Sequence, residues 1–325
     1  MARVIWAQQL LLIAAILTIG FQGAGPQVSV AKISPESTIV LPFELVAGKP
    51  ATLAVLSTDG RIAAGVKLVL SNGEVVTTDE SGRAHFLSPP DVGILIARIP
   101  GTETCAAADV VEQTDTAKLE VARMPAVAAS KDRFAITGNG FQGDADRNRI
   151  DLGGNSAFVL AASPRELVIL ASPQTAAGTV ELAVTIGAEQ VSTQITLVDI
   201  FPDAIRNGVS PGKSGKFVLH VRGTIHPLDL DVQNMSPEIV RFKHGDHGYL
   251  RTRGGADNSA RIEVKGERTG EFSYAVRLRP QPGIANVDVA RDILQATEKL
   301  AKSEEKRRIE KILAKLRPRN VDIRG

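Results

Sequence analysis

The sequence predicts an all-β protein of tandem β-sandwiches, followed by one charged C-terminal α-helix. Between residues 28 and 282, short apolar runs rich in Val, Ile, Leu and Thr alternate with Gly-centred turn signals, which is the pattern of short strands joined by hairpins. The chain has 29 Gly, 17 Pro and only 4% aromatic residues, as expected for many small strands and tight turns. Residues 286–317, in contrast, contain neither Gly nor Pro. A length of 325 residues allows two or three domains of ordinary size.

The first 25 residues are predicted to be a secretory signal peptide. Arg3 precedes an uninterrupted apolar run from Leu10 to Ile19, and small residues follow that run. An uncleaved membrane anchor is the alternative, because residues 4–21 approach a membrane-spanning length. We therefore expect export through the secretory pathway to the periplasm, the cell surface or the extracellular space.

Residues 28–123 are predicted to form a first β-sandwich of six or seven strands. The stretch from Gly65 to Phe86 resembles the immunoglobulin-like and transthyretin-like repeats of bacterial surface proteins. The matching residues are Gly65, Val66, Leu68, Gly73, Thr78, Asp79, Gly82, Arg83, Ala84 and Phe86. The resemblance implies an immunoglobulin-like sandwich for this segment.

Residues 124–199 alternate strands and turns in the same way, and they resemble a more specific family. The segment is similar to the immunoglobulin-like domain shared by plexins and transcription factors (IPT/TIG). The matching positions are Ile136, Gly138, Gly140, Phe141, Asn148, Ile150, Leu152, Gly153, Gly154, Ser163, Pro164, Leu167, Gly178, Val180, Leu182 and Val184. The resemblance implies a fold and a place in extracellular arrays or beside catalytic domains, and it implies no reaction.

Residues 200–282 are predicted to form a third sandwich-like domain, and residues 286–317 a charged helix with a short tail. Asn286 can cap the start of that helix and Pro318 ends it. Its apolar stripe is interrupted by the sequence SEEKRR, which does not favour a coiled coil.

The segment GNGFQGDADRNRIDLGG contains a candidate calcium site. Asp144, Asp146 and Asn148 have the D-x-D-x-N spacing by which alternate residues of a tight loop direct oxygen ligands at one cation. Arg149 stands where a calcium loop needs Gly, and Asn155 where it needs Glu. A solvated turn without metal is therefore the alternative interpretation.

A second candidate metal site lies in KHGDHGY, where His244, Asp246 and His247 could bind zinc. Gly245 and Gly248 make a simple hairpin turn the alternative. No cofactor is predicted.

Charge and motifs restrict the classes of function. Residues 285–325 carry 11 Lys or Arg against 7 Asp or Glu, so this tail is +4 and the remainder of the +2 chain is −2. A field this weak does not suit nucleic acid, and membrane contact is expected only through the signal segment or the basic helix. Cys105 is the one cysteine, so no intramolecular disulfide can form. No nucleophile motif occurs, and the single Trp is Trp6.

These observations favour an exported, non-enzymatic binding or scaffolding protein of the cell envelope or the secreted fraction. A protein partner is favoured, and a polysaccharide is the lesser expectation because few flat rings are present for stacking. The alternatives are a metal-dependent hydrolase centred on His244 and His247, and a passive structural spacer.

Overall fold

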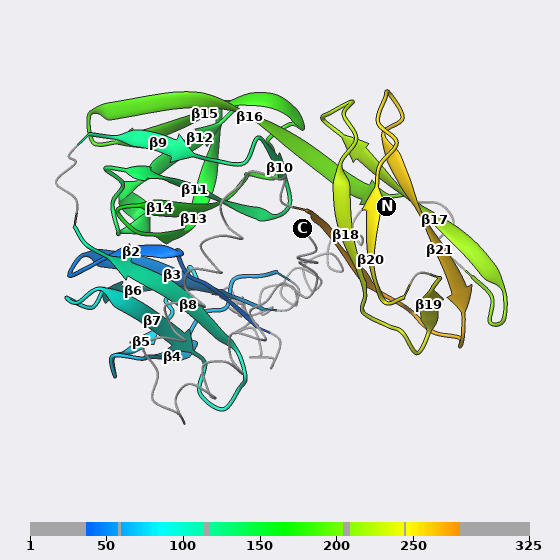
Figure 1. Cartoon of the computed structure of the whole chain (residues 1–325), viewed down its shortest axis with the longest axis horizontal. Helices are drawn as coiled ribbons and strands as arrows, with labels where there is room; N and C mark the ends of the chain where they lie inside the picture. The colour runs from blue at the N-terminus through cyan, green and yellow to red at the C-terminus, as the bar shows by residue number, and fades with distance from the viewer. Residues whose placement is uncertain (1–36, 58–59, 114–117, 204–208, 244, 280–325) are drawn as a thin grey trace, which may run out of the picture. The chain divides into compact units, whose positions relative to one another are not determined.

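The computed structural model describes residues 37–57, 60–113, 118–203, 209–243 and 245–279. Regular structure in these residues is β throughout, apart from one 3-10 turn, η1 (Ala145–Arg147) (Figure 1). The predicted signal peptide over 1–25 and the predicted helix over 286–317 lie outside the described residues. In the part of the chain that is described, no helix is long and apolar enough to cross a membrane. The prediction of an all-β chain of sandwiches is confirmed for these residues.

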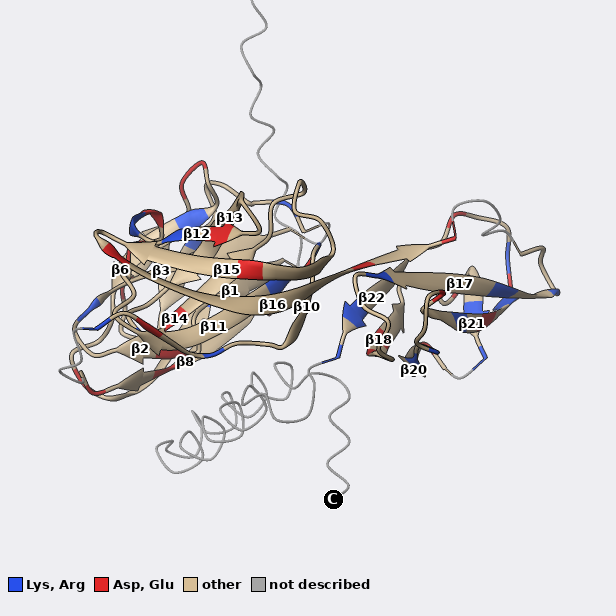
Figure 2. Cartoon of the chain, turned by 90° about the horizontal axis from the view of Figure 1, so that it is seen from above, with Lys and Arg blue, Asp and Glu red and all other residues tan. Residues whose placement is uncertain are grey.

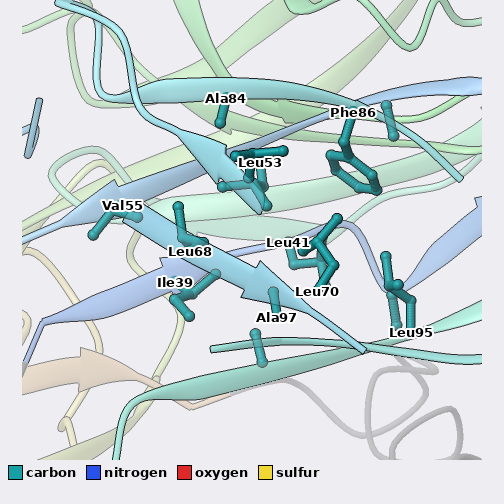
Figure 3. Packing of buried hydrophobic residues seen from close by; sticks show 14 of the residues in the cluster. Ile39, Leu41, Leu53, Val55, Leu68, Leu70, Ala84, Phe86, Leu95 and Ala97 are labelled. Carbon is teal, nitrogen blue, oxygen red and sulfur yellow. The ribbon is translucent and has the colours of Figure 1, made fainter. Parts of the chain in front are cut away.

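The first hydrophobic core lies between two layers of antiparallel and mixed strands. One layer contains β1 (Thr38–Val40), β3 (Pro50–Leu56) and β6 (Arg83–Leu87). The other contains, in spatial order, β2 (Glu44–Val46), β8 (Cys105–Val111), β7 (Gly93–Arg98), β4 (Lys67–Leu70) and β5 (Val75–Thr77). Alternate side chains of the two layers point toward one another, with Leu53, Leu68 and Leu95 fully buried (Figure 3). Each such leucine contributes about 1.5–3 kcal/mol through burial.

The second core is enclosed by two sheets that share one strand. One sheet contains β9 (Glu120–Arg123), β11 (Arg133–Asn139), β14 (Glu166–Leu170) and the end of β13 (Asn155–Ala162). The other contains the start of β13, β12 (Arg149–Leu152), β15 (Gly178–Ile186), β16 (Glu189–Pro202) and β10 (Val127–Ala129). Strand β13 changes sheets between Ala157, which pairs with β12, and Phe158, which pairs with β14, and a register shift follows between Val159 and Ala161.

The third core lies between two layers of strands. One layer contains β16, β17 (Ser214–Arg222), β21 (Ser259–Gly266) and β19 (Val240–Phe242). The other contains β20 (His247–Arg251), β18 (Asp229–Asn234) and β22 (Tyr274–Leu278). Phe217, Phe272 and Tyr274 stack inside it, with ring centroids 5.2–6.3 Å apart. Aromatic pairs at this spacing add stability beyond the area that they bury.

Strand β16 belongs to both the second and the third cores, and it runs through position 199 without interruption (Figure 1). Its first part pairs with β15, and its last four residues, from Asp199 to Pro202, pair with β17. Leu197 is buried in the second core and its neighbour Val198 in the third. Successive side chains of a strand point to opposite faces, so one strand supplies both cores.

A fourth apolar group, here called the junction cluster, connects the first and second cores. It contains Val40, Ala54, Leu56, Leu160, Ala161 and Val168. Strands β3 and β13 also meet through a ladder pair between Thr52 and Ala162. Acidic and basic residues are both spread along the strands and turns, as expected for a chain of small net charge (Figure 2).

Candidate binding site between the first and second cores

Residues 139–148, here called the junction loop, lie directly against strand β3 of the first core. The Gly143 backbone passes so close to Pro50 that a Cβ at position 143 would collide with the Pro50 carbonyl oxygen. The Thr52 hydroxyl donates to the Gly143 carbonyl at 2.6 Å and accepts from the Ala145 N–H at 3.2 Å. The loop is therefore held to the first core through its backbone, at a point where only glycine fits.

His85 completes this contact from strand β6. Its Nδ1 lies 3.0 Å from the Thr52 hydroxyl oxygen. The single hydroxyl proton of Thr52 is already directed at the Gly143 carbonyl, so the hydrogen bond from His85 requires a proton on Nδ1. The ring remains exposed on its other side and borders the cleft described below.

Arg83, also on β6, extends from the first core into the second. Its side chain is only 7% exposed, and it donates to the Asp146 carboxylate at 2.7 Å and to the Val159 carbonyl at 3.3 Å. The guanidinium lies 4.9 Å from the Phe158 ring centroid, within cation–π range. All three of these partners belong to second-core segments, so Arg83 orients the two cores relative to each other.

Glu166 is buried at the same junction, with 1% of its surface exposed. Its Oε2 accepts the backbone N–H groups of Phe43 and Glu44 at 2.7 and 3.2 Å, and its Oε1 is buried without a partner. Burial raises the pKa of Glu166 to about 7, although the two backbone hydrogen bonds lower it; the nearby Glu44 carboxylate raises it further. The Ser163 hydroxyl donates to the Glu44 carbonyl and fixes the same strand.

A cleft of about 620 Å³ opens beside these contacts, with walls from both cores. The first core contributes Val46, Lys49, Pro50, His85 and Gln113, and the second contributes the junction loop with Pro164 and Arg165. Phe141 reaches the cleft but is only 3% exposed, so its ring is not available for stacking. The volume is within the range of small-ligand and peptide side-chain sites.

The charged residues that line the cleft are mainly cations. Lys49, Arg147 and Arg165 line it against one carboxylate, Asp144. Arg147 lies 3.5 Å from Asp144 while its side chain stays 72% exposed, and Arg165 lies 3.7 Å from Glu44. The separation of Arg147 from Asp144, both well exposed to solvent, makes this a loose ion pair of low energy. Three carboxamide side chains, those of Gln113, Asn139 and Gln142, complete the polar surface.

The residues predicted to bind calcium lie together in the junction loop. Asp144 caps η1 by accepting the Asp146 N–H, and Asp146 pairs with Arg83. The Asn148 side chain accepts the Gln142 N–H and donates to the carbonyls of Gln142 and Asp144. The side chains thus have structural roles that the spacing did not reveal, and the calcium ion itself stays a prediction.

The residues predicted to bind zinc are in the third core, and His244 lies outside the described residues. Asp246 accepts hydrogen bonds from Asn234 through both its backbone and its side chain, and His247 begins β20. The alternative of a hairpin turn is wrong, because β19 pairs with β21 and β20 pairs with β18, in different sheets. Among the described residues, no three His, Cys, Asp or Glu side chains are grouped so as to hold a metal ion.

Arg83 and Glu166 are the junction residues whose roles the sequence did not reveal. Arg83 follows a turn in the sequence SGRAHFL and lies on the face of β6 opposite to Ala84 and Phe86, which are buried in the first core. Glu166 precedes the apolar run LVIL, and the backbone groups that bind it are 122 and 123 residues away. Both charges occupy the strand face that alternates away from the core of their own sheet, where a charge is usual, so the local sequence carries no signal of their burial.

Comparisons with known proteins give distant likenesses only. No known protein family and no curated protein matches the chain. Among solved structures, 75% of the chain aligns with 38% of domains 1–6 of the surface-layer protein SbsC, at 13% identity and a TM-score of 0.19. A second structure is that of a Bacteroides ovatus protein, SGBP-B of the mixed-linkage glucan utilization locus, in complex with a mixed-linkage heptasaccharide. The alignment covers 73% of this chain and 72% of that protein, at 12% identity and a TM-score of 0.28. For the I9–I11 tandem from titin the corresponding shares are 74% and 94%, at 13% identity and a TM-score of 0.19. With TM-scores this low, the function has to be argued from the residues of this chain.

Proposed function

We propose that this chain is an exported, non-enzymatic binding and scaffolding protein of the cell envelope or the secreted fraction, with a protein partner. In this proposal the segments 28–123, 124–199 and 200–282 are three immunoglobulin-like domains, the middle one of the IPT/TIG type. A signal peptide over 1–25 directs export, and the charged helix over 286–317 follows the domains.

The observation that carries the proposal is the fixed connection between the cores. The first and second cores share Arg83, Glu166 and the junction cluster, and the second and third share strand β16. Connections of this kind keep separate surfaces at constant spacing, which lowers the entropic cost of binding an extended partner. The cleft between the first two cores offers polar groups from both, as expected of a recognition surface.

Capture of envelope proteins by immobilised residues 26–325, with and without a chelator, tests this function. We expect one dominant protein, retained equally in both conditions. Failure to retain any protein, together with one equivalent of zinc or calcium in the purified chain, would contradict the proposal. That outcome would favour the metal hypotheses at Asp144, Asp146 and Asn148 or at His244, Asp246 and His247.

A further inference from the structure

We propose that the cleft between the first and second cores binds an acidic peptide segment through Lys49 and Arg147. This inference rests on the proposed function, because it names the chemistry of the partner and the surface that binds it. Its ligand is a run of Asp or Glu side chains on an exposed segment of a protein.

The charges of the cleft favour an anionic ligand. Three cations line it against the single carboxylate of Asp144. Within the described part of the chain, no ion pair is formed by Lys49. Among the described residues, Arg147 forms one ion pair, its loose contact with Asp144, so both cations can turn to an incoming carboxylate at little cost.

The remaining lining favours a peptide over a sugar. Gln113, Asn139 and Gln142 place carboxamide groups around the cations, and a carboxamide can both donate to and accept from a peptide backbone. A sugar-binding cleft generally presents a large flat ring of Phe, Tyr or Trp, and among the described residues that line this cleft the one such ring, that of Phe141, is buried in the second core.

The cleft is also preorganised. The Gly143 backbone lies against Pro50, and Thr52 binds the loop at two points, so Lys49 on one wall and Arg147 on the other stay at fixed separation. A ligand that contacts both walls therefore does not have to pay for ordering the loop.

Fluorescence anisotropy with a labelled peptide of alternating Glu and Gly tests the inference on the 26–325 chain. We expect saturable binding that weakens as salt is raised, and no binding of the same peptide with Gln in place of Glu. The double variant Lys49→Glu/Arg147→Glu should weaken binding about tenfold or more, which corresponds to about 1.4 kcal/mol. Lys67→Glu/Arg98→Glu, a matched double change at an exposed Lys and an exposed Arg outside the cleft lining, should change it less than about twofold.

Circular dichroism of each variant, with an unchanged β spectrum and melting temperature, confirms that any loss is not unfolding. Equal binding of the Glu and Gln peptides, or equal effects of the two double variants, would overturn the inference. Binding of polygalacturonate but not of the Glu peptide, with the same dependence on Lys49 and Arg147, would also overturn it in favour of an anionic glycan. The cleft variant and the parent chain could also capture the same envelope partner equally strongly. That result would leave the proposed function intact and would refute only the inference that the partner binds in the cleft.

Discussion

At the scale of single residues, Glu166 makes the stability of the junction depend on pH. Its folded-state pKa of about 7 is above the ordinary value of 4.5, so the folded chain binds this proton more tightly than the unfolded chain. The stabilisation is complete below about pH 4.5 and is lost as the pH rises through about 7. We expect Glu166→Gln to remove this pH dependence. Relative to the wild-type chain, its free energy of unfolding should rise by roughly 3 kcal/mol at most at about pH 8.

Urea unfolding of both chains from about pH 5 to about pH 8 measures this difference. Glu181→Gln, which changes an exposed carboxyl on β15, is the control and should run parallel to the wild-type chain. Parallel curves for Glu166→Gln and the wild-type chain would show that Glu166 titrates alike in the folded and unfolded states.

Gly143 permits the closest backbone contact between the first two cores. Because a Cβ would meet the Pro50 carbonyl, Gly143→Ala must move the junction loop away from β3 and break the Thr52 hydrogen bonds. We expect a loss of about 2 kcal/mol or more in the free energy of unfolding. Gly248→Ala is the matched control, since nothing lies within 4 Å of its added Cβ. Comparable losses in the two variants would mean that the close contact is not maintained in solution.

The residue types of the junction loop could be recognised from the sequence, but their roles could not. The spacing of Asp144, Asp146 and Asn148 is the same for a cation loop and for a capped turn whose side chains bind its own backbone and Arg83. The partners of Asp144 and Asn148 lie within six residues, but the partner of Asp146, Arg83, lies 63 residues away, and local pattern does not encode that contact. Apolar alternation, in contrast, predicted the strands because one side chain in two must face a core.

At the scale of elements, β16 carries two cores on one strand. Leu197 and Val198 are both fully buried, in the second and third cores respectively. The predicted boundary between the second and third domains, after residue 199, falls within this strand. The strand continues because Asp199 to Pro202 find new ladder partners on β17.

We expect the two neighbouring substitutions to act on different cores. Leu197→Ala should lower the stability of the second core by about 2–5 kcal/mol, and Val198→Ala should act mainly on the third. Hydrogen exchange at β15 and β21 amides distinguishes the two effects. Gln194→Ala, an exposed position on the same strand, should alter neither. If both core substitutions deprotect β15 and β21 to the same extent, the two cores unfold as one unit.

At the scale of the whole molecule, the shared contacts predict that the stabilities of the cores are coupled, so that a substitution that destabilises one core also destabilises its neighbour. Leu53 is fully buried in the first core, and Leu53→Ala should lower the protection of β6 amides by about 2–5 kcal/mol. Because Arg83 on β6 binds Asp146 and the Val159 carbonyl, and Glu166 on β14 binds the backbone of residues 43 and 44, part of this loss should reach β14. Arg83→Met removes the guanidinium but keeps an apolar side chain over Phe158. In its presence, β14 amides should lose a smaller part of the protection that Leu53→Ala removes from β6 amides. Full protection of β14 in Leu53→Ala would mean that the junction carries no coupling, and that the cleft between the cores is not held at fixed width.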